Sequence, residues 1–269
     1  MARVKRPKMK ASQQAVVRAP DDISLRLRYA ARLLKRGDPR GEFIRVQCEL
    51  DAAERGTTVG VDLSYPELKR REAALLSDHG ADWAGPVRDL VVSWTFFRGF
   101  VEHVTMEALG FEERGARVFE AAPVRHLDFR NARRRVPELA GSSLLRRCRS
   151  LGFAENDLDD QDLIALAASP HLRRLRWLDL SENRRLTVRG MEALAAASRS
   201  RLSGLRVVLM VGVLASPLYP PEYGHDGTLV ASGPNPVGQK LERKYGKIHW
   251  LHPRLSQGAA HRDTERYRT

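Results

Sequence analysis

The sequence predicts an α/β protein in which a small helical domain precedes a short solenoid of parallel strands and helices. An apolar pattern of the form L-x-x-L-x-L recurs at regular intervals after about residue 87. Stretches with helical periodicity lie between the repeats. The chain before residue 87 has helical periodicity and turn signals but no such repeat.

The helical domain is expected over residues 21–86. The acidic pair 21–22 can cap a helix over about 24–36, which Gly37 would end. Residues 38–39 offer a capping aspartate and a first-turn proline to the next helix, and a third helix is expected over 66–77. This region therefore begins with a tight helical hairpin.

Five repeats are expected within residues 87–251, which we assign to the solenoid. The two most complete are Cys148-x-x-Leu151-x-Phe153-x-x-Asn156 and Leu175-x-x-Leu178-x-Leu180-x-x-Asn183. The fourth position of the five repeats falls at Val104, Leu127, Leu151, Leu178 and Leu205, at intervals of 23, 24, 27 and 27 residues. Residues 159–169 and 188–197 read as the intervening helices, so strands would line the concave side and helices the convex side.

The repeat pattern resembles that of leucine-rich-repeat proteins of the ribonuclease-inhibitor-like type, whose repeats have this length. The resemblance implies that Asn156 and Asn183 are ladder asparagines, whose side chains satisfy backbone groups in the turn after each strand. Residues 212–236 are rich in proline and glycine and are expected to form a long loop. A helix over 237–245 and a strand over 248–251 would then cap the solenoid.

A second resemblance covers roughly residues 21–55 and rests on Leu27-Arg28-Tyr29-Ala30, on Leu34-Lys35 and, most specifically, on the run Arg36-Gly37-Asp38-Pro39-Arg40-Gly41-Glu42-Phe43-Ile44-Arg45-Val46-Gln47-Cys48-Glu49-Leu50. This run resembles the bacterial repeat-companion domain, a family that occurs beside repeats such as leucine-rich ones. Ala31 and Arg32 stand where the family usually has Asp-Trp, so any role of that pair is absent here. The resemblance implies a helical domain and no established activity.

The composition favours an acidic partner. The 269-residue chain has a formal net charge of +13 and a pI near 10.3. Residues 1–20 and 252–269 are expected to be disordered basic tails. The two cysteines, Cys48 and Cys148, lie in apolar patterns and are expected to be reduced core residues. No secretory signal and no membrane span is expected, which favours the cytoplasm.

The candidate binding surface comes from aligning the repeats. Strand alternation would bring two rows of side chains to the concave sheet, with a third row at its rim. An outward tryptophan beside arginines has the composition of a binding hot spot. The predicted partner-binding residues are Trp177, Arg176, Arg149, Arg125, His126, Asp128 and Asp179.

No catalytic motif, metal-ligand spacing or cofactor-binding turn is present in the sequence. The sequence therefore predicts a non-catalytic scaffold that binds a protein partner on the concave face. The alternative is a nucleic-acid-associated basic protein that uses its tails and an arginine ladder on phosphates. The oligomeric state is not encoded in any of these patterns.

Overall fold

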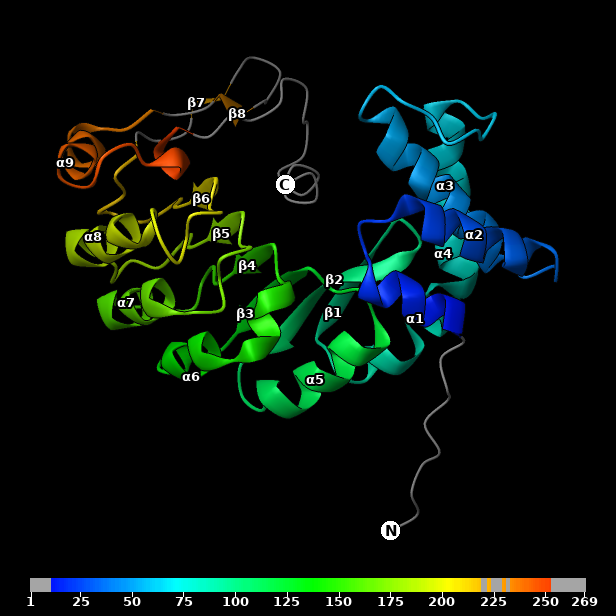
Figure 1. Cartoon of the computed structure of the whole chain (residues 1–269), viewed down its shortest axis with the longest axis horizontal. Coiled ribbons are helices and arrows are strands. Elements are labelled where there is room, and N and C mark those ends of the chain that lie inside the picture. The colour runs from blue at the N-terminus through cyan, green and yellow to red at the C-terminus, as the bar shows by residue number, and fades with distance from the viewer. Residues whose placement is uncertain (1–10, 219–221, 224–228, 231–232, 253–269) are drawn as a thin grey trace, which may run out of the picture. The chain divides into compact units, whose positions relative to one another are not determined.

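The computed structural model describes residues 11–218, 222–223, 229–230 and 233–252 (Figure 1). In this part of the chain the fold is α/β, with nine α-helices and a six-stranded, mostly parallel sheet of order β1-β2-β3-β4-β5-β6. The helices are α1 (Ala11–Arg18), α2 (Ile23–Leu34), α3 (Arg40–Ala53), α4 (Tyr65–Arg88), α5 (Phe111–Ala121), α6 (Val136–Gly141), α7 (Asp160–Ala168), α8 (Val188–Ala197) and α9 (Pro236–Tyr245), with 3-10 turns η1 (Ser143–Arg147) and η2 (His249–Leu251). The strands are β1 (Ser93–Phe97), β2 (Phe100–Glu107), β3 (His126–Arg130), β4 (Ser150–Gly152), β5 (Trp177–Asp179), β6 (Val207–Leu209), β7 (Glu222–Tyr223) and β8 (Leu229–Val230).

The chain divides into two compact units. The first holds the residues up to Val104 together with Arg114–Val124, and the second holds Thr105–Glu113 and the residues from Arg125 on. The sequence had placed the boundary after residue 86. The β1–β2 hairpin lies instead with the helices, because long-range contacts tie its turn to α2 and α3.

Helices α2 and α3 form the predicted hairpin. Asp22 caps α2 by accepting a hydrogen bond from the backbone N–H of Leu25, and Gly37 ends the helix with a φ of +68°. The two helices cross closely at Gly41, where a Cβ atom would lie 2.6 Å from the carbonyl oxygen of Ala30. Any larger residue at this position would push the helices apart.

The turn between β1 and β2 is fixed by α3. Arg98 and Gly99 both have positive φ, as a two-residue hairpin turn of type I′ requires. A Cβ atom at Gly99 would clash with Ile44 at 2.3 Å, so the turn lies directly on α3. The Gln47 side chain donates to the carbonyl of Phe96 and accepts from the N–H of Gly99 at 2.7 Å.

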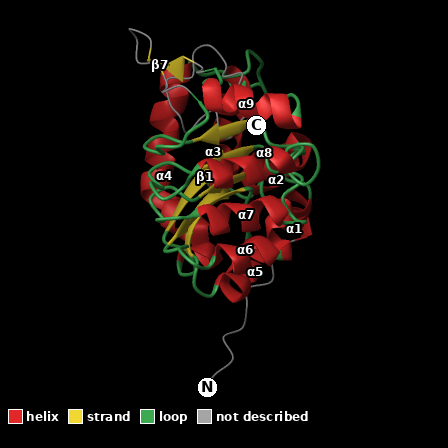
Figure 2. Ribbon diagram, turned by 90° about the vertical axis from the view of Figure 1, so that its left-hand side faces the viewer, coloured by secondary structure: helices red, strands yellow, loops and turns green. Residues whose placement is uncertain are grey.

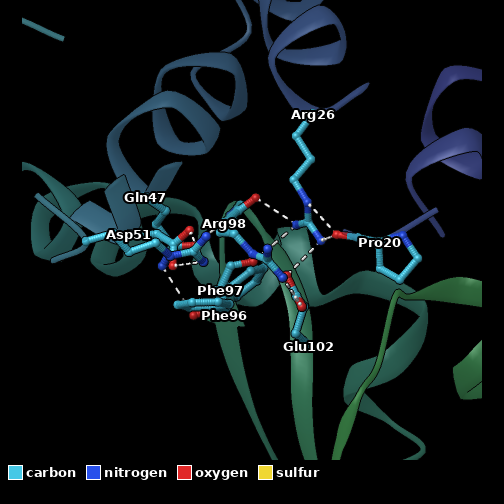
Figure 3. A network of polar contacts seen from close by, with 10 residues as sticks. Pro20, Arg26, Gln47, Asp51, Phe96, Phe97, Arg98 and Glu102 are labelled. Carbon is cyan, nitrogen blue, oxygen red and sulfur yellow. Dashed lines mark hydrogen bonds and ion pairs between the residues drawn. The ribbon is translucent and has the colours of Figure 1, made fainter. Parts of the chain in front are cut away.

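A buried ion-pair network ties the same turn to α2 (Figure 3). Arg26, with no exposed surface, donates to the backbone carbonyls of Pro20 and Arg98 and pairs with Glu102 at 2.8 Å. Arg98 pairs with the other oxygen of Glu102 at 3.0 Å. Burial lowers the pKa of Arg26, and the Glu102 carboxylate opposes that shift. The role of these charges is thus structural: two guanidinium groups share one buried carboxylate.

The predicted disordered tail over residues 1–20 is wrong for the part that the structure describes. Residues 11–18 form helix α1, and Val16 is completely buried in a cluster with Tyr29 and Ile44. Burial of the apolar pair 16–17 contributes favourable free energy, which offsets the conformational entropy lost when the segment becomes ordered. Residues 1–10 lie outside the described part, as do residues 253–269 of the other predicted tail.

Strands β3 to β6 of the second unit are parallel and in register. Leu127, Leu151, Leu178 and Val208 stand side by side, and each is at most 3% exposed. Helices α6, α7 and α8 follow one another along one face of these strands (Figures 1 and 2). The predicted register of β3, β4 and β5 and the predicted helices α7 and α8 are confirmed.

The predicted register of β6 is wrong by three residues. The prediction aligned Leu205 with Leu178, whereas the structure pairs Leu178 with Val208. Leu202, Leu205 and Val208 are all apolar at three-residue spacing, so the pattern fits the sequence in two positions. The loop before β6 is therefore three residues longer than expected.

Asn156 and Asn183 have the predicted ladder geometry. The amide oxygen of Asn183 accepts from the N–H groups of Asn156 and Leu158, and its nitrogen donates to the carbonyls of Phe153 and Leu180. Asn156 repeats the arrangement one strand earlier by accepting from Ala132. Each asparagine thus joins the turns that follow two neighbouring strands.

The last strand of the six-stranded sheet, β6, packs against η2, and α9 packs on α8. Trp250 is fully buried and its indole nitrogen donates to the Ser198 hydroxyl at 2.8 Å. The strand predicted over 248–251 is wrong, because His249–Leu251 form a 3-10 turn.

Within the predicted loop over 212–236, β7 and β8 pair as antiparallel strands, and residues 219–221, 224–228 and 231–232 lie outside the described part.

Candidate functional site

The structure aligns the predicted site residues of the second unit in rows. His126, Ser150 and Trp177 form one row, and Asp128, Gly152 and Asp179 form another. Because Leu127, Leu151 and Leu178 point toward the helices, strand alternation sends both rows to the opposite face of the sheet. We call this surface the sheet face.

The first row is not exposed as the binding hypothesis required. Trp177 is 3% exposed and His126 is 2% exposed. Ser150 and Val207 stand in register on either side of Trp177, so the indole lies among neighbouring strands rather than in solvent. The predicted aromatic anchor is therefore a core residue, while Asp128 and Asp179 in the second row are half-buried.

Arginines form a row at the amino-terminal end of the strands. The backbone N–H of Arg149 donates to the carbonyl of Arg125, that of Arg176 to Arg149, and that of Arg206 to Arg176. The predicted β6 register, which is wrong by three residues, would align Ser203 with Arg176, whereas the structure aligns Arg206 there. The corrected row holds four arginines, and their exposure increases from buried Arg125 to exposed Arg206.

Backbone carbonyls fix two of these guanidinium groups. Arg176 donates to the carbonyl of Gly204 at 2.8 Å, and Arg206 donates to those of Ser203 and Leu205 at 2.9 and 3.0 Å. Burial lowers the pKa of Arg176, and the positive charges of Arg206 and Arg149 lower it further. The row therefore brings positive charges close to one another.

Further arginines adjoin this row, and sequence reasoning missed them. They lie in the connectors 143–149, 170–176 and 198–206, which lead into β4, β5 and β6. We call these three connectors the basic edge. They contain nine arginines and no aspartate or glutamate. The signal that could have identified them is the repeated Arg-Arg-x-Arg at 146–149 and 173–176.

The opposite end of the strands has a balanced charge. Arg133 pairs with Asp157 at 2.8 Å, Arg185 lies 3.6 Å from Asp157 and Asp159, and Arg184 lies 3.6 Å from Glu182. We call the segments 131–135, 153–162 and 180–187 the mixed edge. The two ends of one sheet thus differ in charge although both are rich in arginine.

The described residues contain neither a cluster of metal-ligating side chains nor a membrane-spanning helix. No group of three or more histidine, cysteine, aspartate or glutamate side chains is placed to hold a metal ion there. The same part of the chain contains no helix both long and apolar enough to span a bilayer. Cys48 and Cys148 form no disulfide and are buried as predicted, and burial raises the pKa of Cys48 to about 12.

Comparison of the chain with protein-family models, with curated proteins and with solved structures finds no match. The resemblance to the repeat-companion domain therefore depends on sequence pattern within residues 21–55 alone, and its most specific run is 36–50. In the structure these residues hold α3 against its neighbours: Gly41 contacts α2, Gln47 binds the hairpin turn, and Glu42 pairs with Arg71 of α4.

Proposed function

We propose that this chain is a non-catalytic scaffold that binds a protein partner on the sheet face of its second unit. In this proposal the second unit is a short leucine-rich-repeat solenoid of the ribonuclease-inhibitor-like type, and the first is a helical repeat-companion domain. The register-aligned rows and the asparagine hydrogen bonds support the solenoid assignment. Repeat arrays of this kind present broad, rigid surfaces to macromolecules.

The second row of the sheet face carries the proposal. It presents the half-buried side chains of Asp128, Asp179 and Leu209, with the buried Gly152 between the two aspartates. Half-exposed Arg149 and Arg176 lie at the start of the same strands. A surface with both charge signs and an apolar position suits a protein partner, whereas its carboxylates would repel a phosphate backbone.

The test is capture of proteins from a lysate of the native host by the full chain, at low and high salt and with nuclease treatment. The variant Asp128→Asn/Asp179→Asn removes the two charges but keeps acceptors in the turn, where Asp179 accepts from Ser181. The control Glu113→Gln/Glu138→Gln removes the same charge from exposed helical positions. We expect nuclease-resistant capture that the first variant reduces and the control does not.

Capture that disappears with nuclease would contradict a protein partner. Capture reduced equally by both variants would show that net charge, and not the sheet face, governs binding. Thermal unfolding of each variant checks that the fold is retained.

A further inference from the structure

The connectors of the basic edge lie at the same end of the second unit. Each runs from a helical segment to the next strand, and β4, β5 and β6 are parallel and in register. Their amino ends therefore lie side by side, about 4.8 Å apart from strand to strand. This geometry stacks arginines from three successive connectors on one edge.

Most of these arginines reach solvent. Exposed positions are Arg146, Arg173, Arg174, Arg199, Arg201 and Arg206, while Arg149 and Arg176 are half-buried. Within the described residues, none of the six exposed arginines has an ion-pair partner. The mixed edge is different, because Arg133, Arg184 and Arg185 there each face a carboxylate.

From this contrast we propose that the basic edge binds the phosphate backbone of a nucleic acid. Arginine suits this ligand because its planar guanidinium can form paired hydrogen bonds to phosphate oxygens. The carbonyl contacts of Arg176 and Arg206 hold these groups in place before the ligand binds, which reduces the entropy lost on association. An evenly spaced, acid-free row matches an evenly spaced polyanion better than it matches a protein surface of mixed charge.

The size of the edge is consistent with a short contact. The three strand-spaced arginines of this edge, Arg149, Arg176 and Arg206, span about 10 Å, which is roughly three nucleotides of one strand at about 3.4 Å each. The three connectors contain no phenylalanine, tyrosine or tryptophan for stacking on bases. Binding should therefore be largely independent of base sequence and steeply dependent on salt. This inference shares Arg149 and Arg176 with the margin of the sheet face, but its ligand is different and its test uses other variants, so either proposal can fail alone.

Fluorescence anisotropy with labelled single-stranded RNA, single-stranded DNA and duplex DNA tests the inference on the full chain. The variant Arg173→Gln/Arg174→Gln/Arg201→Gln removes three exposed charges that have no hydrogen bond or ion pair within the described residues. The control Arg133→Gln/Arg184→Gln/Arg185→Gln removes the same charge from the mixed edge. Both variants keep the basic residues of 1–10 and 253–269, so any difference between them reports on the edge alone.

We expect the basic-edge variant to weaken binding roughly tenfold or more near 0.1 M salt and to lower the salt slope for single strands by about 2, whereas the control stays close to wild type. The variant Arg173→Lys/Arg174→Lys/Arg201→Lys should lose only part of the affinity, because it keeps the charge without the paired hydrogen bonds. Equal losses in the basic-edge and control variants, or no binding by the wild type, would overturn the inference. Binding of a labelled polyglutamate peptide in place of all three nucleic acids would assign the edge to an acidic protein instead.

Discussion

Asn183 joins two turns of the second unit through one side chain. It is fully buried, and its oxygen is the acceptor for two backbone N–H groups. The spacing of the apolar pattern located this residue, and the resemblance to leucine-rich repeats implied its role. The side chain is thus predictable from local pattern.

Removing that side chain should be costly. We expect Asn183→Ala to lower the free energy of unfolding by about 2–4 kcal/mol, since the buried N–H groups of Asn156 and Leu158 would lose their acceptor. Urea unfolding followed by circular dichroism measures the change. Gln161→Ala, at an exposed position of α7, serves as the control and should change stability by less than about 0.5 kcal/mol. A similar small effect at Asn183 would contradict the ladder role.

Trp177 marks the limit of reasoning from single residues. Strand alternation predicted the row in which it lies, and that row is confirmed. The exposure of Trp177 depends on the side chains of the neighbouring strands, and the pattern of a single strand does not predict them. The basic edge was missed for a related reason, because its arginines lie in connectors outside the aligned apolar pattern.

Strand β6 shows how an element can be recognised and still be misplaced. Its existence follows from the apolar pattern, but Leu202, Leu205 and Val208 allow two alignments. Packing decides between them, because Val208 is 3% exposed beside Leu178 whereas Leu209 is half-buried beside Asp179. The choice also determines that Arg206 completes the arginine row.

Two substitutions distinguish the alignments. Val208→Asp should destabilise the second unit by more than about 3 kcal/mol, because it buries a carboxylate that has no partner. Leu209→Asp should cost about 1 kcal/mol, mainly because aspartate is a poor strand residue. Chemical denaturation gives both values. If Leu209→Asp were the more damaging change, the register of β6 would be wrong.

At the level of the whole chain, the sequence predicted the α/β class and the order of most helices and strands. Prediction from the sequence failed at contacts between segments that are far apart in the chain. Gln47 of α3 binds Gly99 across 52 residues and Arg26 of α2 binds Glu102, so β1 and the first part of β2 belong to the helical unit. Periodicity relates only residues that are close in sequence, so it does not predict contacts between residues that are far apart in the chain.

Helix α1 supplies a test of where the first unit begins. Deletion of residues 1–10 keeps Val16, whereas deletion of 1–19 removes it and leaves a hole beside Tyr29 and Ile44. Burial of a valine contributes about 1.5–3 kcal/mol, so the longer deletion should lower the melting temperature by about 3–8 °C relative to the shorter one. Calorimetry of both proteins makes the comparison. Equal melting temperatures would mean that α1 adds nothing to the fold.

The asparagine contacts also determine how the turns respond to deuterated water. The N–H groups of Asn156 and Leu158 lie outside the helices and strands, where amide hydrogens commonly exchange fast. Both are hydrogen-bonded to Asn183, which lies in the turn after the next strand, β5. Their hydrogens can exchange only when that turn moves away. Deuterium uptake at these amides therefore reports the opening of the turn after β5 rather than the local mobility of the turn that contains them.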